Sequence, residues 1–152
     1  LAGCAVRFAR PLRLDLGGIA KGYAVDLALA ALAGTDATVS AGGDLAMTRW
    51  QGRDVEIRTP GSEGRSTIAL PMVNRSLATS AAYYLTGDHV ILNPRNLEPL
   101  ARRDSASVFA YSCMVADALT KVVLLSPQPS PVLTRFDAQG IIISLEGTVS
   151  RL

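Results

Sequence analysis

The sequence has few aromatic residues and no strong excess of either charge, and both shortages argue against a nucleic-acid partner. Aromatic residues make up 5% of the 152 residues, so no platform for stacking single-stranded bases is evident. Basic and acidic residues are interspersed, and the net charge of +2 is too balanced for a surface that follows a phosphate backbone. We therefore expect no nucleic-acid partner.

Histidine, cysteine and long apolar runs are also scarce. His89 is the only histidine, so this chain cannot form a multi-histidine zinc site, and a Ser-His-Asp triad would have to use His89. A lone histidine is usually a surface or packing residue. Cys4 and Cys113 are the only cysteines, and no disulfide framework can be inferred from them. No apolar stretch reaches the ~18 residues of a membrane-spanning helix, so we expect no membrane span in this chain.

The length and the composition suit one globular domain. Hydrophobic residues make up 49% of the chain and charged residues 18%, which is typical of a folded protein rather than a disordered one. A chain of this length can bury a substantial core. We therefore expect residues 1–152 to form a single domain.

The residue pattern predicts an α+β fold with a mostly antiparallel sheet and two main helices. One helix follows the turn at 15–18 and stops near Gly34, and the other spans 112–125 and ends before Pro127. A short helix is also predicted at 132–138. Alternating or β-branched runs predict strands at 5–14, 37–40, 54–59, 66–73, 75–79, 89–92, 106–110, 141–145 and 148–152. Strands and helices are segregated rather than strictly alternating, which favours the α+β class.

The segment Asp-Leu-Gly-Gly-Ile-Ala-Lys-Gly at 15–22 could bind a phosphate. Glycines at a strand-to-helix turn let a ligand approach the backbone, and the first N–H groups of a helix attract an anion. Lys21 could add a positive charge, and Asp15 could bind a ligand hydroxyl or a metal. The alternative is a glycine-rich turn in which Asp15 is the N-cap of the helix. The segment is not a P-loop, because no Gly-Lys-Ser/Thr is present.

Two loops and one helix carry further polar candidates. Two glycines precede Asp44, whose carboxylate could hold a turn or contact a ligand. The hydroxyl groups of Thr79 and Ser80 could donate to a phosphate or stabilise a turn. Asp117 interrupts an apolar helix, so its carboxylate must be exposed, paired or bound to a cation. Lys121 lies four residues further on and could simply pair with it.

Taken in order, these segments resemble the ApbE family of FAD:protein FMN transferases. The segments are Asp-Leu-Gly-Gly-Ile-Ala-Lys-Gly-Tyr-Ala-Val-Asp (15–26), Ala-Gly-Gly-Asp (41–44), Ala-Thr-Ser (78–80), a His-to-Asn-Pro-Arg segment (89–95) and Ala-Asp-Ala-Leu (116–119). The likeness runs from about residue 13 to residue 145, and the first motif is the most specific.

The resemblance implies a T-fold-like α+β domain and a reaction. Family members move FMN from FAD onto a threonine of an acceptor flavoprotein, release AMP and use Mg²⁺, in the bacterial periplasm or as membrane-anchored lipoproteins. By position, the resemblance assigns the catalytic base to His89 and the metal to Gly18, Asp117, Thr120 and Lys121. It assigns FAD contacts to Asp15, Gly17, Lys21, Gly43, Asp44, Thr79, Ser80 and Ile91.

Three positions depart from the family pattern. Lys121 replaces a hydroxyl residue, and an ammonium repels Mg²⁺ rather than binding it. Either Thr120 serves instead, or Lys121 replaces part of the ion's charge and binds the pyrophosphate itself. Asn93 replaces the aspartate of an Asp-Pro pair. His89 stands one residue earlier than the family's histidine, and a one-residue shift on a strand turns a side chain to the opposite face.

Two other functions stay open from the sequence. The chain lacks the N-terminal portion that completes the isoalloxazine pocket in family members, so we expect either a fragment or a pocket completed by a partner chain. One alternative is a degenerate homologue that binds FAD without transferring FMN. The other is a structural or interaction domain that binds no flavin.

Overall fold

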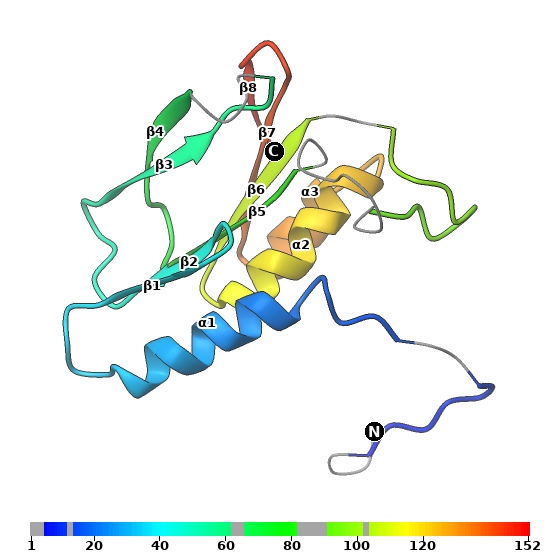
Figure 1. Cartoon of the computed structure of the whole chain (residues 1–152), viewed down its shortest axis with the longest axis horizontal. Helices are drawn as coiled ribbons and strands as arrows, with labels where there is room; N and C mark the ends of the chain where they lie inside the picture. Colours follow the sequence, from blue (N-terminus) through cyan, green and yellow to red (C-terminus); the bar gives the residue numbers. More distant parts are fainter. Residues whose placement is uncertain (1–4, 12–13, 62–65, 82–90, 102–103) are drawn as a thin grey trace.

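The computed structural model describes residues 5–11, 14–61, 66–81, 91–101 and 104–152. These residues form three layers, with helices on one face of a six-stranded sheet and a two-stranded ribbon on the other (Figure 1). The helices are α1 (Ala20–Ala31), α2 (Cys113–Leu125) and α3 (Ser130–Arg135). The α+β class with an antiparallel sheet, predicted from the sequence, is confirmed.

The large sheet has the strand order β1-β2-β5-β6-β7-β8, and every neighbouring pair is antiparallel. Its strands are β1 (Thr38–Ala41), β2 (Asp44–Met47), β5 (Ser76–Ala81), β6 (Ser105–Ala110), β7 (Gln139–Ile143) and β8 (Val149–Arg151). The ribbon pairs β3 (Asp54–Arg58) with β4 (Thr67–Pro71). Strand β6 lies inside the sheet and is buried along its whole length.

The alternation of side chains along β5 and β6 explains the three layers. Ala78 and Val108 lie opposite each other and face the helices, where they join a core with α2 and α3. Leu77 and Phe109, one residue away on each strand, face the ribbon and pack with Ile57 of β3. Because successive side chains on a strand point to opposite faces, one pair of strands serves both cores.

Helices α1 and α2 pack closely where α2 begins. A Cβ atom added to Gly22 would lie 2.4 Å from the carbonyl oxygen of Cys113, so only glycine fits at this contact. The carboxylate of Asp26 on α1 accepts hydrogen bonds from the backbone N–H groups of Cys113 (2.9 Å) and Met114 (3.0 Å). It also accepts one from the hydroxyl of Ser112 at 2.7 Å. A side chain of one helix thus caps the other.

Three element predictions need correction. The predicted strand at 5–14 is wrong within residues 5–11, which are exposed and form no strand: Ala5 makes only an isolated bridge, and Pro11 lacks an N–H donor. Strand β2 was not predicted, because Gly42 and Gly43, which precede it, are typical of a loop. Most of the predicted strand at 89–92 lies outside the described residues, and Leu92 makes only an isolated bridge with Pro99. Among the described residues, no helix is long and apolar enough to cross a membrane.

Candidate functional site

A pocket of about 730 Å³ opens between the start of α1, the turn after β1, the ribbon strand β3, strand β5 and helix α2. This volume lies in the range of sites for small molecules and cofactors. Its apolar wall includes Leu45, Ile57 and Leu77. The predicted FAD or metal residues that line it are Gly17, Lys21, Gly43, Thr79, Ser80, Ile91 and Lys121.

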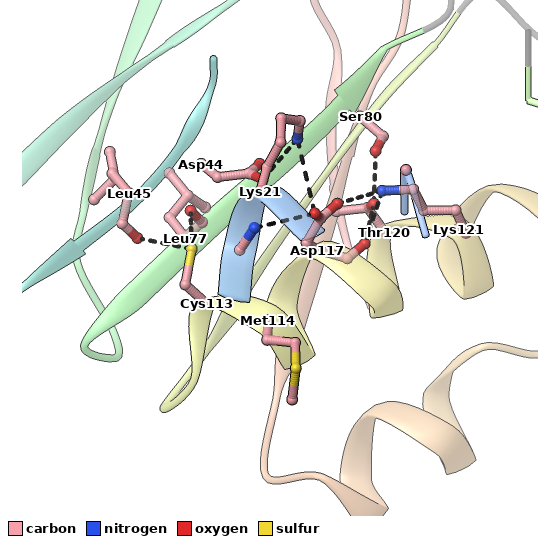
Figure 2. Close-up of polar contacts among 12 residues, drawn as sticks. Lys21, Asp44, Leu45, Leu77, Ser80, Cys113, Met114, Asp117, Thr120 and Lys121 are labelled. Atoms are coloured by element: carbon pink, nitrogen blue, oxygen red, sulfur yellow. Dashed lines mark hydrogen bonds and ion pairs between the residues drawn. The ribbon is translucent and has the colours of Figure 1, made fainter. Parts of the chain in front are cut away.

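The turn between β1 and β2 lines the pocket with the backbone of two glycines, which have no side chains. Gly42 and Gly43 have φ angles of +57° and +95°, which suit the two central residues of a tight hairpin turn. Asp44, which follows them, begins β2 and is fully buried. Its carboxylate therefore does not hold the turn, which was one of the two predicted roles, but points to Lys21 (Figure 2).

Lys21 lies in the first turn of α1 and joins two buried carboxylates. Its Nζ donates to Asp44 Oδ2 at 2.7 Å and lies 3.8 Å from Asp117 Oδ2. Burial acts to lower the pKa of Lys21, but the hydrogen bond that Lys21 donates to Asp44 and the charges of Asp44 and Asp117 outweigh it and raise the pKa. Lys21 therefore stays an ammonium, and its side chain is 47% exposed toward the pocket.

The carboxylate of Asp44 has a raised pKa. Burial raises its pKa, and the neighbouring charge of Asp117 raises it further, whereas Lys21 acts to lower it. Its second oxygen, Oδ1, is buried and has no hydrogen-bond partner among the described residues. The carboxylate of Asp44 thus depends on Lys21 for compensation.

Asp117 lies on α2, and its side chain is 1% exposed. Both of its carboxylate oxygens accept hydrogen bonds from protein donors (Figure 2). Oδ2 accepts from the backbone N–H of Gly22 at 3.3 Å, and Oδ1 accepts from Lys121 Nζ. The carbonyl oxygen of Asp117 accepts from Lys121 Nζ at 3.0 Å and from the hydroxyl of Thr120 at 2.7 Å. The predicted pairing of Asp117 with Lys121 is present.

The hydroxyl groups predicted to meet a phosphate already have protein partners. Ser80 Oγ lies 2.7 Å from Thr120 Oγ1, and Thr79 Oγ1 lies 2.7 Å from Ser107 Oγ. Thr120 is fully buried, whereas Ser80 lines the pocket. Thr79 lines the pocket as well, so Thr79 and Ser80, but not Thr120, are the hydroxyl groups of this set that a ligand in the pocket can reach.

The turn before α1 offers fewer free N–H groups than the sequence predicted. Gly17 N–H donates to Asp15 Oδ1 at 2.7 Å, and the N–H groups of Ile19 and Ala20 both donate to the carbonyl of Leu16. Asp15 itself is exposed and does not line the pocket. Its predicted N-cap role is wrong, because Ile19 is the N-cap and Asp15 instead stabilises the turn ahead of the helix.

The predicted metal residues come together, but their arrangement does not fit Mg²⁺. The aliphatic end of Lys121 lies against Gly18, where an added Cβ would meet Lys121 Cε at 3.3 Å. Its ammonium holds the carboxylate and the carbonyl of Asp117, which are the hard oxygen atoms that Mg²⁺ would need. Among the described residues, no group of three or more His, Cys, Asp or Glu side chains could hold a metal ion.

The predicted base cannot be placed. His89 lies outside the described residues. Asn93, at the position of the family's aspartate, accepts a hydrogen bond from the N–H of Arg95 at 3.0 Å and so shapes a local turn. It does not line the pocket.

Sequence reasoning missed two features of the site. One is Asp26, which fixes the start of α2 and hence the position of Asp117. Its signal was a single carboxylate in an apolar helix, the same signal that drew attention to Asp117. The other is β3, which contributes Glu56 and Arg58 to the pocket wall and had only been predicted as a strand.

Comparisons with known proteins identify the family and similar folds. Residues 4–139 match the sequence model of the ApbE family. The flavin transferase ApbE from Vibrio cholerae has a similar structure, with a TM-score of 0.69 at 22% identity, over 91% of this chain and 50% of that chain. No curated protein matches the chain.

Two further solved structures are similar. The ApbE protein from Thermotoga maritima has a TM-score of 0.64 at 28% identity, over 91% of this chain and 51% of that chain. The flavinyl transferase ApbE from Pseudomonas stutzeri, in its apo form, has a TM-score of 0.64 at 25% identity, over 91% and 48%. The chain thus spans about half the length of the solved structures that it matches.

Proposed function

The chain belongs to the ApbE family, and on that premise we propose that it carries the flavin-nucleotide site of an FAD:protein FMN transferase. The enzyme would move FMN from FAD to a threonine of an acceptor flavoprotein and release AMP. Because the chain spans about half the length of its solved relatives, the proposal concerns the activity of the whole enzyme.

One observation carries the proposal: two ammonium groups from different helices face the same pocket. Lys21 of α1 and Lys121 of α2 both line it, and each is held by a buried carboxylate. Attack of a threonine hydroxyl on the FMN phosphorus breaks the bond to AMP, and negative charge builds up on the phosphate oxygens. Fixed positive groups near those oxygens stabilise the transition state.

Positive side chains rather than the helix N-terminus would bind the pyrophosphate. Several N–H groups of the turn before α1 already have acceptors within the protein. Lys21 is protonated and half-exposed at the pocket, and Ser80 offers a hydroxyl beside Thr120. The apolar wall of Leu45, Ile57 and Leu77 suits one of the flat ring systems of FAD.

The contact between Lys121 and Asp117 favours a second candidate, a homologue that binds FAD without transferring FMN. In that case the ammonium would fix the nucleotide, and no base would be needed at the pocket. The acceptor protein would then not be a substrate.

Incubation of the purified protein with FAD, Mg²⁺ and a threonine-bearing acceptor tests both candidates, with intact-mass measurement of the acceptor. The transferase predicts an FMN-sized mass gain on the acceptor, which should disappear when the target threonine is replaced by alanine. Binding of FAD without any mass gain would support the second candidate. A protein that neither binds FAD nor modifies the acceptor would contradict both.

A further inference from the structure

We propose that the ammonium of Lys121 replaces the divalent cation at this site, so that the protein binds a flavin nucleotide without metal. This inference rests on the proposed function for the identity of the nucleotide. It goes further by naming the group that neutralises the phosphates.

The ammonium sits on the oxygen atoms that a cation would use. Lys121 Nζ contacts both Oδ1 and the backbone carbonyl oxygen of Asp117, whose side chain is 1% exposed. An ammonium has three N–H donors, and these two contacts leave one for a ligand in the pocket that Lys121 lines. A phosphate oxygen is a suitable acceptor for it.

Covalent attachment fixes this cation in place. Lys121 and Asp117 are four residues apart on α2 and lie on the same face of the helix. The end of the lysine side chain lies against Gly18, where a Cβ atom would come within 3.3 Å of Lys121 Cε. The ammonium is therefore present whatever the concentration of metal, and no ion has to be captured from solution.

The charge at the base of the pocket is already balanced. The chain contains two lysines, and both lie within 4 Å of Asp117, while Lys21 also pairs with Asp44. Two buried carboxylates thus meet two ammonium groups. Buried carboxylates either pair or bind metal, and these two are paired. A divalent ion would have to displace Lys121 and then remain close to a positive charge.

Metal binding and FAD binding can be measured separately in matched variants. Lys121→Thr restores the hydroxyl of the family pattern, whereas Lys121→Met removes the charge without adding a ligand. For the wild type we expect FAD affinity to change by less than about twofold between EDTA and Mg²⁺, and no stoichiometric Mn²⁺ binding by electron paramagnetic resonance. For Lys121→Thr in EDTA we expect FAD affinity to fall about tenfold or more, as for a lost charge-assisted hydrogen bond.

The two variants should then respond differently to metal. In Lys121→Thr, Mg²⁺ should recover much of the lost FAD affinity, and about one Mn²⁺ should bind per chain. In Lys121→Met, Mg²⁺ should not recover FAD affinity, and no stoichiometric Mn²⁺ should bind. Loss of FAD binding by the wild type in EDTA, or one tightly bound Mn²⁺ in the wild type, would overturn the proposal.

Nuclear magnetic resonance of the wild type avoids any question of whether a variant folds. Protein labelled with ¹⁵N at the lysine Nζ should give two ammonium signals, one for each lysine. FAD added in EDTA should shift both, whereas Mg²⁺ alone should shift neither. A shift of the Lys121 signal with Mg²⁺ alone would show that metal displaces it. If FAD binds under no condition, the proposed function fails, while the Mn²⁺ and Mg²⁺ titrations still decide whether metal is excluded.

Discussion

Each of the helices α1 and α2 has an aspartate whose carboxylate accepts hydrogen bonds from the backbone of the other helix, and the two aspartates differ in their other partners. Asp26 of α1 accepts from two backbone N–H groups and a hydroxyl at the start of α2. Asp117 of α2 accepts from the backbone N–H of Gly22 on α1, but its other partners are the ammonium groups of Lys21 and Lys121. Both aspartates interrupt apolar helices.

The donors that contact Asp26 and Asp117 differ in how far they can move. Backbone N–H groups at a helix start cannot leave their carboxylate without unfolding the turn, so Asp26 stabilises structure. An ammonium at the end of a long side chain can also reach a ligand, and both lysines border the pocket. We infer that Asp26 acts on stability and that Asp117 acts on binding, and this distinction can be tested by substitution.

Gly22→Ala should have the largest effect on stability, because it acts on both contacts at once. The new Cβ would lie 2.4 Å from the carbonyl oxygen of Cys113, which is backbone and cannot turn aside. We expect the free energy of unfolding to fall by about 3 kcal/mol, measured by urea denaturation. Gly18→Ala is the control, since its Cβ would meet only the flexible end of Lys121, and its stability should change by less than about 1 kcal/mol. A Gly22→Ala protein as stable as the wild type would show that the helices can separate freely.

Asp117→Asn should have the largest effect on binding. Asparagine keeps the size and an acceptor for Gly22 N–H, but it leaves Lys121 without a negative partner. We expect FAD affinity, measured by fluorescence titration, to weaken about a hundredfold, as when one member of a buried charge pair is lost. Transfer of FMN to an acceptor should fall in parallel. Unchanged affinity would remove Asp117 from the binding site.

Asp26→Ala should lower stability but leave FAD affinity nearly unchanged. Loss of the cap at the start of α2 should lower the free energy of unfolding by about 2 kcal/mol. FAD affinity at a temperature where the variant is folded should stay within about twofold of the wild type. Asp26→Asn, which keeps acceptor capacity, should lie between the two in stability. A loss of affinity as large as that of Asp117→Asn would mean that the two carboxylates are not separable.

The sequence predicted the parts of this site that depend on local pattern. Periodicity placed both long helices. The lone carboxylate in an apolar helix left Asp117 exposed, paired or bound to a cation, and the structure shows the pairing with Lys121. The order of short motifs indicated the family, which the match over residues 4–139 confirms. These features need only neighbours within a few residues, or a fixed order along the chain.

The features that sequence reasoning missed depend on contacts between distant segments. Asp26 and Cys113 are 87 residues apart, and nothing near Asp26 shows that it caps another helix. Asp44 was considered a turn or ligand residue, because the glycines before it conceal that a strand begins there. The strand predicted at 5–14 does not form within residues 5–11, because a strand needs a neighbouring strand to exchange hydrogen bonds with along its length, and a local pattern does not show whether one is there.

Cys113, the buried first residue of α2, gives the smallest effect that we predict, and this effect depends on pH. Burial and then the charges of Asp44, Asp26 and Asp117 raise the pKa of its thiol from 9.0 to about 12. The unfolded thiol ionises near pH 9 while the folded one stays protonated, so the stability that it contributes is complete below pH 9 and is lost as the pH approaches 12. Between pH 9 and 10 this loss is about 1 kcal/mol.

A Cys4→Ser background leaves Cys113 as the one thiol, and Cys113→Ser in that background removes the ionising group. Lys21 does not interfere, because its pKa is raised above 10.5 and its contribution persists through this window. Urea denaturation at pH 9 and pH 10 should therefore show a stability loss that is about 1 kcal/mol smaller in the Cys113→Ser protein. The same comparison can be made in Asp26→Ala and in Asp117→Asn proteins. If Asp26→Ala reduces the difference in stability loss between the proteins with and without Cys113 more than Asp117→Asn does, the charge of Asp26 acts more strongly on the thiol than the charge of Asp117. Equal changes in stability with and without Cys113 would mean that the thiol ionises as readily in the folded protein as in the unfolded chain, contrary to its burial against α1 and strands β2 and β5.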